Sequence, residues 1–142
     1  MKLTEVQQQW IADLRSGNYA QGRNHLKTET KEVGIQYCCL GVAAERLTTK
    51  VTHGGTNDKL YYRFDGEGAW LSDRLVKQLG LKNKSGQFRV SLLPTRWSQW
   101  IYGKTNVVAE STSLAALNDR GVSFEVIADL LEQHPWVFFV PN

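Results

Sequence analysis

Apolar residues recur at helical spacing near both ends of the chain. From Val6 to Leu14 they repeat every four positions, and Thr4 and Gln7 have the spacing of a capping box. A glycine follows that can close a helix in the left-handed conformation. We therefore predict a helix over residues 5–16. The same pattern, bounded by capping Ser or terminating Gly, predicts helices over residues 40–47, 73–79, 113–118 and 124–133.

Short apolar and β-branched runs bounded by turn residues predict strands over residues 26–30, 35–39, 60–64, 88–92 and 136–140. The sequence DGEG at 65–68 favours a turn after which residues 69–71 return as the hairpin partner of 60–64. Residues 97–102 fit a strand or a helical turn, and both remain open. The polar, glycine-bearing stretch from Thr48 to Lys59 is predicted to be a mobile loop that could cover a site.

Helices and hairpins alternate without the spacing of βαβ units, which favours the α+β class. Neither a repeat nor a low-complexity linker interrupts residues 1–142. We expect a single compact domain with a mainly antiparallel sheet and several short helices.

The composition is globular, with 42% hydrophobic and 22% charged residues. The net charge of +3 permits an anionic ligand without requiring one. The chain has no apolar run long enough to span a membrane, and its N-terminus lacks the apolar region of a signal peptide. We expect a cytoplasmic protein with no membrane partner.

The two cysteines, Cys38 and Cys39, are adjacent, so they fit neither a disulfide framework nor a CxxC motif. They lie where a predicted strand leads into a helix, a position that favours packing as small buried side chains. A helix N-terminus can lower a thiol pKa, so a reactive cysteine is the alternative.

Recognisable catalytic and cofactor motifs are missing from the sequence. The histidines His25, His53 and His134 are isolated, and neither a GxxxxGK[ST] loop nor a GxGxxG turn occurs. We therefore predict no metal, no cofactor and no catalytic residue, and a protein that is not an enzyme. A small hydrolase that uses His53, or Asp65 with Glu67, stays open as an alternative.

The first candidate binding cluster comprises Arg15, Tyr19, Gln21 and Arg23. Two guanidiniums, a ring and an amide within nine residues suit a phosphorylated, base-bearing ligand. The alternative is an ordered loop with a packed tyrosine and solvated arginines.

The second candidate cluster comprises Arg96, Trp97 and Trp100, with further cations and a tyrosine nearby. Aromatic rings stack on bases and cations bind phosphates. Core packing and a subunit interface are alternatives, because Trp is also common in both.

Three segments together resemble a family of small, uncharacterised proteins of tailed bacteriophages and prophages. They are LRSGNYAQG at 14–22, YCCLGV at 37–42 and LAALNDRGVSFEVIADLLE at 114–132, which match the patterns LRSGxYxQG, YCCLGV and LNDxGxSFxxIAD. The family supplies no catalytic residues to transfer. Residues 48–111 lie outside the resemblance.

The resemblance implies an accessory phage protein in the host cytoplasm. Such proteins often block host defences, and several unrelated ones trap nucleotide-derived signals. We therefore expect a protein that binds and sequesters a nucleotide-derived immune signal without catalysis, and that could form a homo-oligomer. The alternatives are a direct inhibitor of a host defence enzyme and a small nucleic-acid-binding protein.

Overall fold

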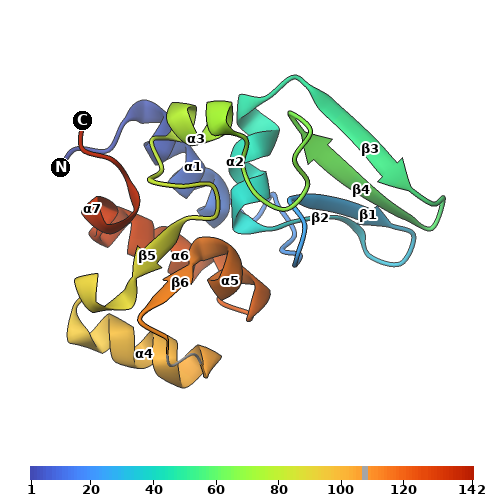
Figure 1. Cartoon of the computed structure of the whole chain (residues 1–142). Coiled ribbons are helices and arrows are strands. Elements are labelled where there is room, and N and C mark those ends of the chain that lie inside the picture. The colour runs from blue at the N-terminus through green and yellow to red at the C-terminus, as the bar shows by residue number, and fades with distance from the viewer. Residues whose placement is uncertain (107–108) are drawn as a thin grey trace.

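Helices and short antiparallel strands alternate along the chain, which confirms the α+β class (Figure 1). The computed structural model describes residues 1–106 and 109–142. In chain order the elements are α1 (Glu5–Arg15), β1 (Lys27–Thr30), β2 (Gly34–Tyr37), α2 (Cys39–Leu47), β3 (Val51–Gly55), β4 (Lys59–Phe64), α3 (Asp73–Leu79), β5 (Gln87–Arg89), η1 (Val90–Leu92, a 3₁₀ turn), α4 (Thr95–Thr105), β6 (Ser111–Ser113), α5 (Leu114–Asp119), α6 (Phe124–Gln133) and α7 (Pro135–Phe138).

Four strands form an antiparallel sheet in the order β2-β1-β4-β3, and β5 pairs with β6 in a second, two-stranded sheet. The larger sheet extends to one side of the helices, and the β3–β4 hairpin reaches furthest from them (Figure 1). Helix α4 lies at the other end, beside β5 and β6. The larger sheet therefore leaves much of its area in contact with solvent.

The core lies between the helices and the inner end of this sheet. Trp10 on α1 is buried, and its indole Nε1 donates to the Cys39 carbonyl oxygen at the start of α2 (3.0 Å). Its ring also packs edge-to-face on Phe139, with the centroids 6.2 Å apart. The Trp10 side chain therefore joins the first helix to the second helix by a hydrogen bond and to the C-terminal segment by a buried ring contact.

Helix α2 approaches the start of β1 so closely that only glycine fits at Gly41. A Cβ atom at this position would overlap the carbonyl oxygen of Leu26. The Leu26 carbonyl is itself fixed, because it accepts a hydrogen bond from the Cys38 backbone (3.2 Å). The contact sets how near the sheet lies to the helices.

The helices predicted from periodicity and capping are confirmed to within one or two residues. The Thr4 and Gln7 capping box is present in α1, Ser72 caps α3, and Ser123 caps α6. A capping side chain accepts a hydrogen bond from a backbone N–H group only two or three residues further along the chain. Helix starts can therefore be recognised from a few consecutive residues of the sequence.

Three strand predictions are wrong. Residues 136–140 do not form a strand: Pro135 begins the short helix α7, and only Phe139 makes an isolated bridge, to Leu81. Residues 69–71 do not pair with β4, whose partners are β1 and β3. Of residues 88–92, only 88 and 89 are in a strand, β5, and η1 follows. Short apolar runs do not distinguish buried strands from buried helical turns.

The stretch from Thr48 to Lys59 is not a loop throughout, because residues 51–55 form β3 and pair with β4. Every residue of β3 is exposed. A strand with no buried face needs no alternation of apolar and polar residues, so the pattern that identifies a half-buried strand is missing from its sequence. Residues 97–102, left open above, lie within helix α4.

None of the helices in the described part of the chain has the length and apolar character needed to cross a membrane.

Gly41→Ala and Gly103→Ala form a matched pair of helix substitutions. We expect Gly41→Ala to lower the free energy of unfolding by about 3 kcal/mol or more, because the added methyl overlaps fixed backbone. Gly103 in α4 has nothing within 4 Å of an added Cβ, so Gly103→Ala should be neutral or stabilise by up to about 1 kcal/mol. Urea unfolding monitored by circular dichroism measures both values. Equal stabilities for the two variants would contradict the close approach of α2 to Leu26.

Candidate ligand-binding site

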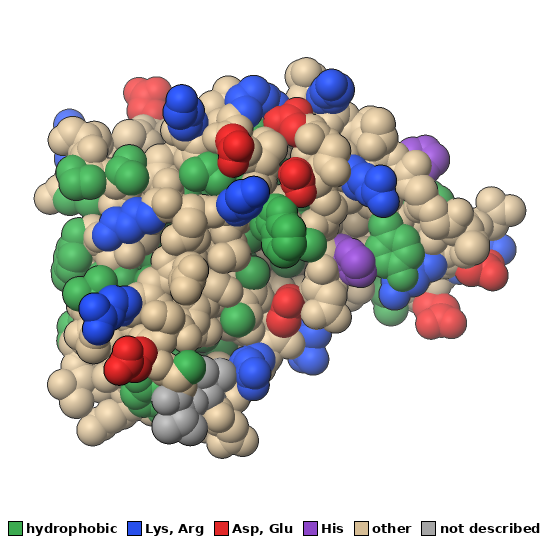
Figure 2. All heavy atoms as spheres, in the orientation of Figure 1, with side chains coloured by type: hydrophobic (Ala, Val, Ile, Leu, Met, Phe, Trp, Pro, Cys, Tyr) green, Lys and Arg blue, Asp and Glu red, His purple; other side chains and the backbone are tan. Residues whose placement is uncertain are grey.

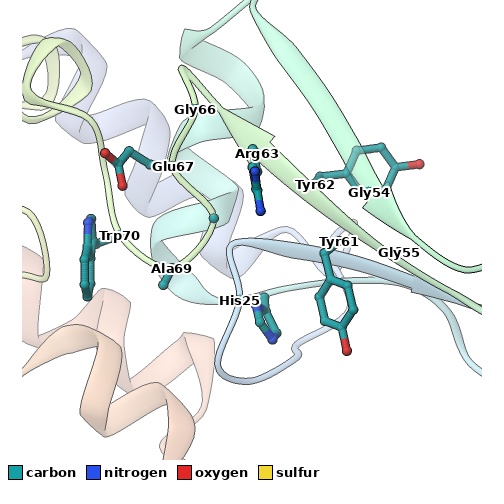
Figure 3. A pocket seen from close by; sticks show the side chains of 11 residues that line it. His25, Gly54, Gly55, Tyr61, Tyr62, Arg63, Gly66, Glu67, Ala69 and Trp70 are labelled. Atoms are coloured by element: carbon teal, nitrogen blue, oxygen red, sulfur yellow. The ribbon is translucent and has the colours of Figure 1, made fainter.

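An open groove runs over one face of the four-stranded sheet. It has two adjoining lobes of about 550 Å³ and about 400 Å³, and His25 lines both of them. The side chains of the first lobe are His25, Tyr61, Arg63, Glu67, Ala69 and Trp70; Tyr62 also borders the lobe, but its side chain projects to the opposite face of the sheet (Figure 3). The side chains of the second lobe are Gln21, Arg23, Asn24, His25, Thr28, Thr30, Gln36 and Lys59. We call the two lobes together the sheet-face groove.

The sheet register brings the two lobes to the same face. Thr28 on β1 lies opposite both Gln36 on β2 and Tyr61 on β4, so these three side chains project to one side. Lys59 and Arg63 are two residues before and after Tyr61 and therefore share this side. Alternation along β4 thus places a cation, a ring and a second cation in a row.

In the first lobe, aromatic side chains and a cation line two sides (Figure 3). Trp70 lies on one side, and Arg63, His25 and Tyr61 lie together on the other, with Arg63 above His25 in this view. The His25 and Tyr61 rings make an edge-to-face contact with their centroids 4.5 Å apart. Trp70 is 48% exposed although it is a large apolar side chain. The lobe therefore offers ring surfaces and a guanidinium to a ligand.

The arginines of the groove differ from those of the helices in having no partner. Within residues 1–106 and 109–142, the side chains of Arg23 and Arg63 make no hydrogen bond or ion pair that satisfies their guanidiniums. Three helical arginines bind carboxylates: Arg15 contacts Asp129 and Glu132, Arg46 contacts Asp13, and Arg74 contacts Asp65. The guanidiniums of Arg23 and Arg63, in contrast, are available to a ligand.

His25 is held neutral near pH 7. Partial burial lowers its pKa, and the charge of Lys59 lowers it further against a smaller opposite effect of Asp119. Lys59 itself lies over the Tyr61 ring, with Nζ 5.2 Å from the centroid. The neutral imidazole can stack or form a hydrogen bond without adding charge to the groove.

The opposite face of the sheet has its polar groups paired. Lys27 binds Glu45 on α2 (3.0 Å), and the Tyr37 hydroxyl donates to the same carboxylate (3.1 Å). The Tyr62 hydroxyl donates to Glu29 (2.7 Å). Because these groups satisfy one another, this face has structural rather than ligand-binding chemistry.

The loop that contains Arg23 and His25 is fixed by the buried side chain of Asn118. Its Oδ1 accepts from Gln21 Nε2 (2.8 Å) and from the Cys39 backbone (3.2 Å), and its Nδ2 donates to the Gly22 carbonyl (2.8 Å). These bonds hold residues 21 and 22 against α2 and α5.

The far end of the same loop is bound to the segment that contains Trp70. The Leu26 backbone donates to the Gly68 carbonyl (2.7 Å), so the residue after His25 is joined directly to the wall of the first lobe. The Asn24 backbone, at a left-handed φ of 68°, donates to Asp119 (2.8 Å). Both walls of the groove are therefore positioned by backbone hydrogen bonds.

Two residues of the first predicted cluster point away from the groove. The Arg15 guanidinium binds Asp129 (2.7 Å) and Glu132 (3.0 Å) on α6. The Tyr19 ring packs edge-to-face on Tyr37 at 5.1 Å, and burial raises its pKa. This arrangement fits the alternative of an ordered loop for these two residues.

The other two residues of that cluster line the second lobe. The Gln21 side-chain amide donates hydrogen bonds to Asn118 Oδ1 and the Val122 carbonyl, and it accepts one from the Phe124 backbone. Gln21 therefore supports the loop. Arg23 is exposed and unpaired, and it is the residue of this cluster best placed to contact a ligand.

Arg96, Trp97 and Trp100 lie together, but elsewhere. They line a separate cavity of about 310 Å³ with Val126 and Gln133 of α6. The two indole rings make an edge-to-face contact at 6.0 Å, and Arg96 donates weakly to Gln133 (3.4 Å). The two predicted clusters therefore do not form one site.

Sequence reasoning missed Tyr61, Arg63 and Trp70, and it regarded His25 as an isolated surface histidine. Tyr61 and Arg63 are two residues apart in a predicted strand, and this spacing was the available indication that they share one face of the sheet. The face of the sheet on which Tyr61 and Arg63 lie is set by the pairing register of β4 with β1, which could not be derived from the sequence alone.

The residues of the hydrolase alternative are not assembled. His53 lies opposite Tyr62, and its ring packs on that tyrosine at 5.7 Å, on the face away from Tyr61. Asp65 accepts hydrogen bonds from Thr48, Ser72 and Arg74. Desolvation raises the pKa of Asp65, but these bonds outweigh it and hold the pKa below its ordinary value, so Asp65 is a poor general acid.

Among the described residues, no three His, Cys, Asp or Glu side chains gather where they could hold a metal ion.

The fold and the groove define a small α+β protein with an open, basic and aromatic site on one sheet face. The family model of a domain of unknown function, DUF8296, matches residues 1–135, so the chain belongs to this family. No curated protein and no solved structure matches it.

The prediction that the cysteines pack is confirmed. Both are buried and free, and Cys39 Sγ donates to the Leu114 carbonyl (3.5 Å). Burial raises the pKa of Cys38 to about 11 and that of Cys39 well above its ordinary value. Neither forms a thiolate near neutral pH.

We expect the native protein to resist thiol labelling by Ellman's reagent at pH 8, because this pH is below both raised pKa values and both sulfurs are buried. In 8 M urea, both thiols should react completely. Fast labelling of one thiol in the native state, with circular dichroism unchanged, would contradict the buried position.

Proposed function

We propose that the protein is a non-catalytic binder of a nucleotide-like ligand, which occupies the sheet-face groove. One observation carries the proposal: the unpaired guanidiniums of Arg23 and Arg63 lie in the same groove as the exposed ring of Trp70 and the partly buried ring of Tyr61. Rings bind the faces of bases, and guanidiniums bind phosphate oxygens in a bidentate manner.

The size and the lining of the groove agree with such a ligand. The first lobe, at about 550 Å³, falls in the usual range for small-molecule sites. The His25–Tyr61 pair lies on the same side of the lobe as Arg63, so a base stacked on this pair would bring an attached phosphate close to the guanidinium (Figure 3). The groove is open, which suits entry of a ligand from solution.

The polar residues of the first lobe favour binding over turnover. In the described part of the chain, neither the His25 nor the Glu67 side chain makes a hydrogen bond that would orient it as a general base or acid. Glu67 is the carboxylate of this lobe, and it lies near Trp70 rather than beside His25 (Figure 3). An exocyclic amino group of a base is a suitable partner for it.

The biological use that we propose is sequestration of a nucleotide-derived immune signal in the host cytoplasm. This part rests on the resemblance of the LRSGxYxQG, YCCLGV and LNDxGxSFxxIAD segments to tailed-phage and prophage proteins. A protein that only binds its ligand can remove a signal in proportion to its own concentration, so no catalytic group is needed.

A protein-binding surface on α4 is the second candidate function. Trp100 is 38% exposed, Leu92 on η1 is 51% exposed, and Trp97 Nε1 is buried without a partner among the described residues. Exposed aromatic side chains of this kind occur in interaction surfaces, so α4 supports the alternative of a direct inhibitor of a host defence enzyme.

Arg63→Ala should weaken nucleotide binding by about 1.5 to 3 kcal/mol, which is the usual loss for a charge-assisted hydrogen bond. Isothermal titration calorimetry with AMP and UMP measures the affinities. Arg89→Ala is the matched control, because Arg89 is also exposed and has no side-chain hydrogen bond or ion pair among the described residues, but lies on β5 outside the groove. Trp100→Ala tests the α4 cavity. If Trp100→Ala and not Arg63→Ala lowers the affinity, the groove is the wrong site.

A further inference from the structure

We infer that the ligand of the sheet-face groove contains two nucleotide units joined by a phosphodiester. This inference rests on the proposed function and specifies its ligand class. It follows from the division of the groove into two lobes with different linings and separate cations.

The two lobes suit different parts of such a ligand. The first is lined by rings, of which Trp70 and Tyr61 present the largest surfaces, and its cation is Arg63. The second is polar, with the hydroxyl of Thr30, the amide of Asn24 and the cations Arg23 and Lys59. A base stacks in the first lobe, while ribose and phosphate groups find donors and acceptors in the second.

The cations are distributed over both lobes, with Arg63 in the first and Arg23 and Lys59 in the second. Lys59 and Arg63 project from the same face of β4 on either side of Tyr61, so their Cα atoms are about 13 Å apart at the rise of an extended strand. The phosphates of a nucleoside polyphosphate are adjacent groups joined through single oxygen atoms. Phosphates separated by a ribose can reach cations that flank a ring.

His25 occupies the junction between the lobes. Its ring lines both, packs on Tyr61 and is neutral near pH 7 because burial and Lys59 lower its pKa. A neutral ring at this position can contact the sugar or base that connects the two units without repelling Arg63. The junction is therefore built for a ligand that continues from one lobe into the other.

The same chemistry has two sources: a free dinucleotide and a segment of single-stranded nucleic acid. Basic side chains on this face lie at separate places, and no continuous basic stripe crosses it (Figure 2). Long nucleic acids are usually bound along such stripes. The free dinucleotide is therefore the source that the surface favours.

The test compares ligands of increasing length by isothermal titration calorimetry at one fixed salt concentration. The probes are AMP and UMP, the linear dinucleotides pApA and pUpU, the cyclic dinucleotides of the same bases, and single-stranded hexamers of A and U. We expect one dinucleotide to bind at least about tenfold more tightly than its mononucleotide, because it adds contacts in the second lobe. Hexamers that bind more tightly than every dinucleotide would identify the polymer as the source.

Arg23→Ala separates the two lobes. It should weaken binding of the dinucleotide about tenfold more than it weakens binding of AMP, whereas Arg63→Ala should weaken both by a similar factor. Arg23 is exposed and unpaired, so the variant should fold, which circular dichroism checks, and Arg89→Ala again serves as the control.

Failure of the inference is distinguishable from failure of the proposed function. Mononucleotides that bind as tightly as dinucleotides, with affinity lost in Arg63→Ala and kept in Arg23→Ala, would overturn the two-unit ligand and leave the proposed function in place. If no probe of any length binds the folded protein, both are overturned.

Discussion

The buried amide of Asn118 is the interaction on which the rest of the structure depends. Its Oδ1 and Nδ2 atoms bind the Gln21 side chain, the Gly22 carbonyl and the Cys39 backbone, and so join segments separated by up to 97 residues. Away from water, a satisfied amide strengthens its neighbours, while removal of one partner leaves several polar groups unpaired. The start of α2, the loop before β1 and the α5–α6 turn are therefore held together by one side chain.

The position of this network gives a structural role to three segments of the chain, residues 14–22, 37–42 and 114–132. LRSGNYAQG contains Gln21, YCCLGV contains Cys39 and the close-packed Gly41, and the C-terminal segment contains Asn118. These segments build the scaffold, whereas Tyr61, Arg63 and Trp70 lie outside them on the sheet and the following loop. Gln21 belongs to both the network and the second lobe, whereas Tyr61, Arg63 and Trp70 belong to the groove alone, so these three groove residues can change without disturbing the Asn118 network.

Sequence alone could predict the elements whose signals are local. Thr4 with Gln7, Ser72 and Ser123 fix helix starts within a single turn, and α1, α3 and α6 form as expected. The all-exposed strand β3 has no apolar alternation, and the apolar run after Pro135 packs as a helical turn, so both were misread. Arg23 was found because it lies in a recognisable loop, whereas Arg63 required the pairing of β4 with β1, which joins residues more than thirty positions apart.

The scaffold and the groove differ in whether their arginine side chains form ion pairs. Arg15, Arg46 and Arg74 each bind a carboxylate, so the charges of these three helical arginines are neutralised by their partners. On the sheet face, burial lowers the pKa of His25, and the charge of Lys59 lowers it further against a smaller opposite effect of Asp119, so positive charge acts at the junction of the two lobes. If an anion binds in the groove as proposed, it would offset part of this charge, and binding would then stabilise the folded state through the same side chains.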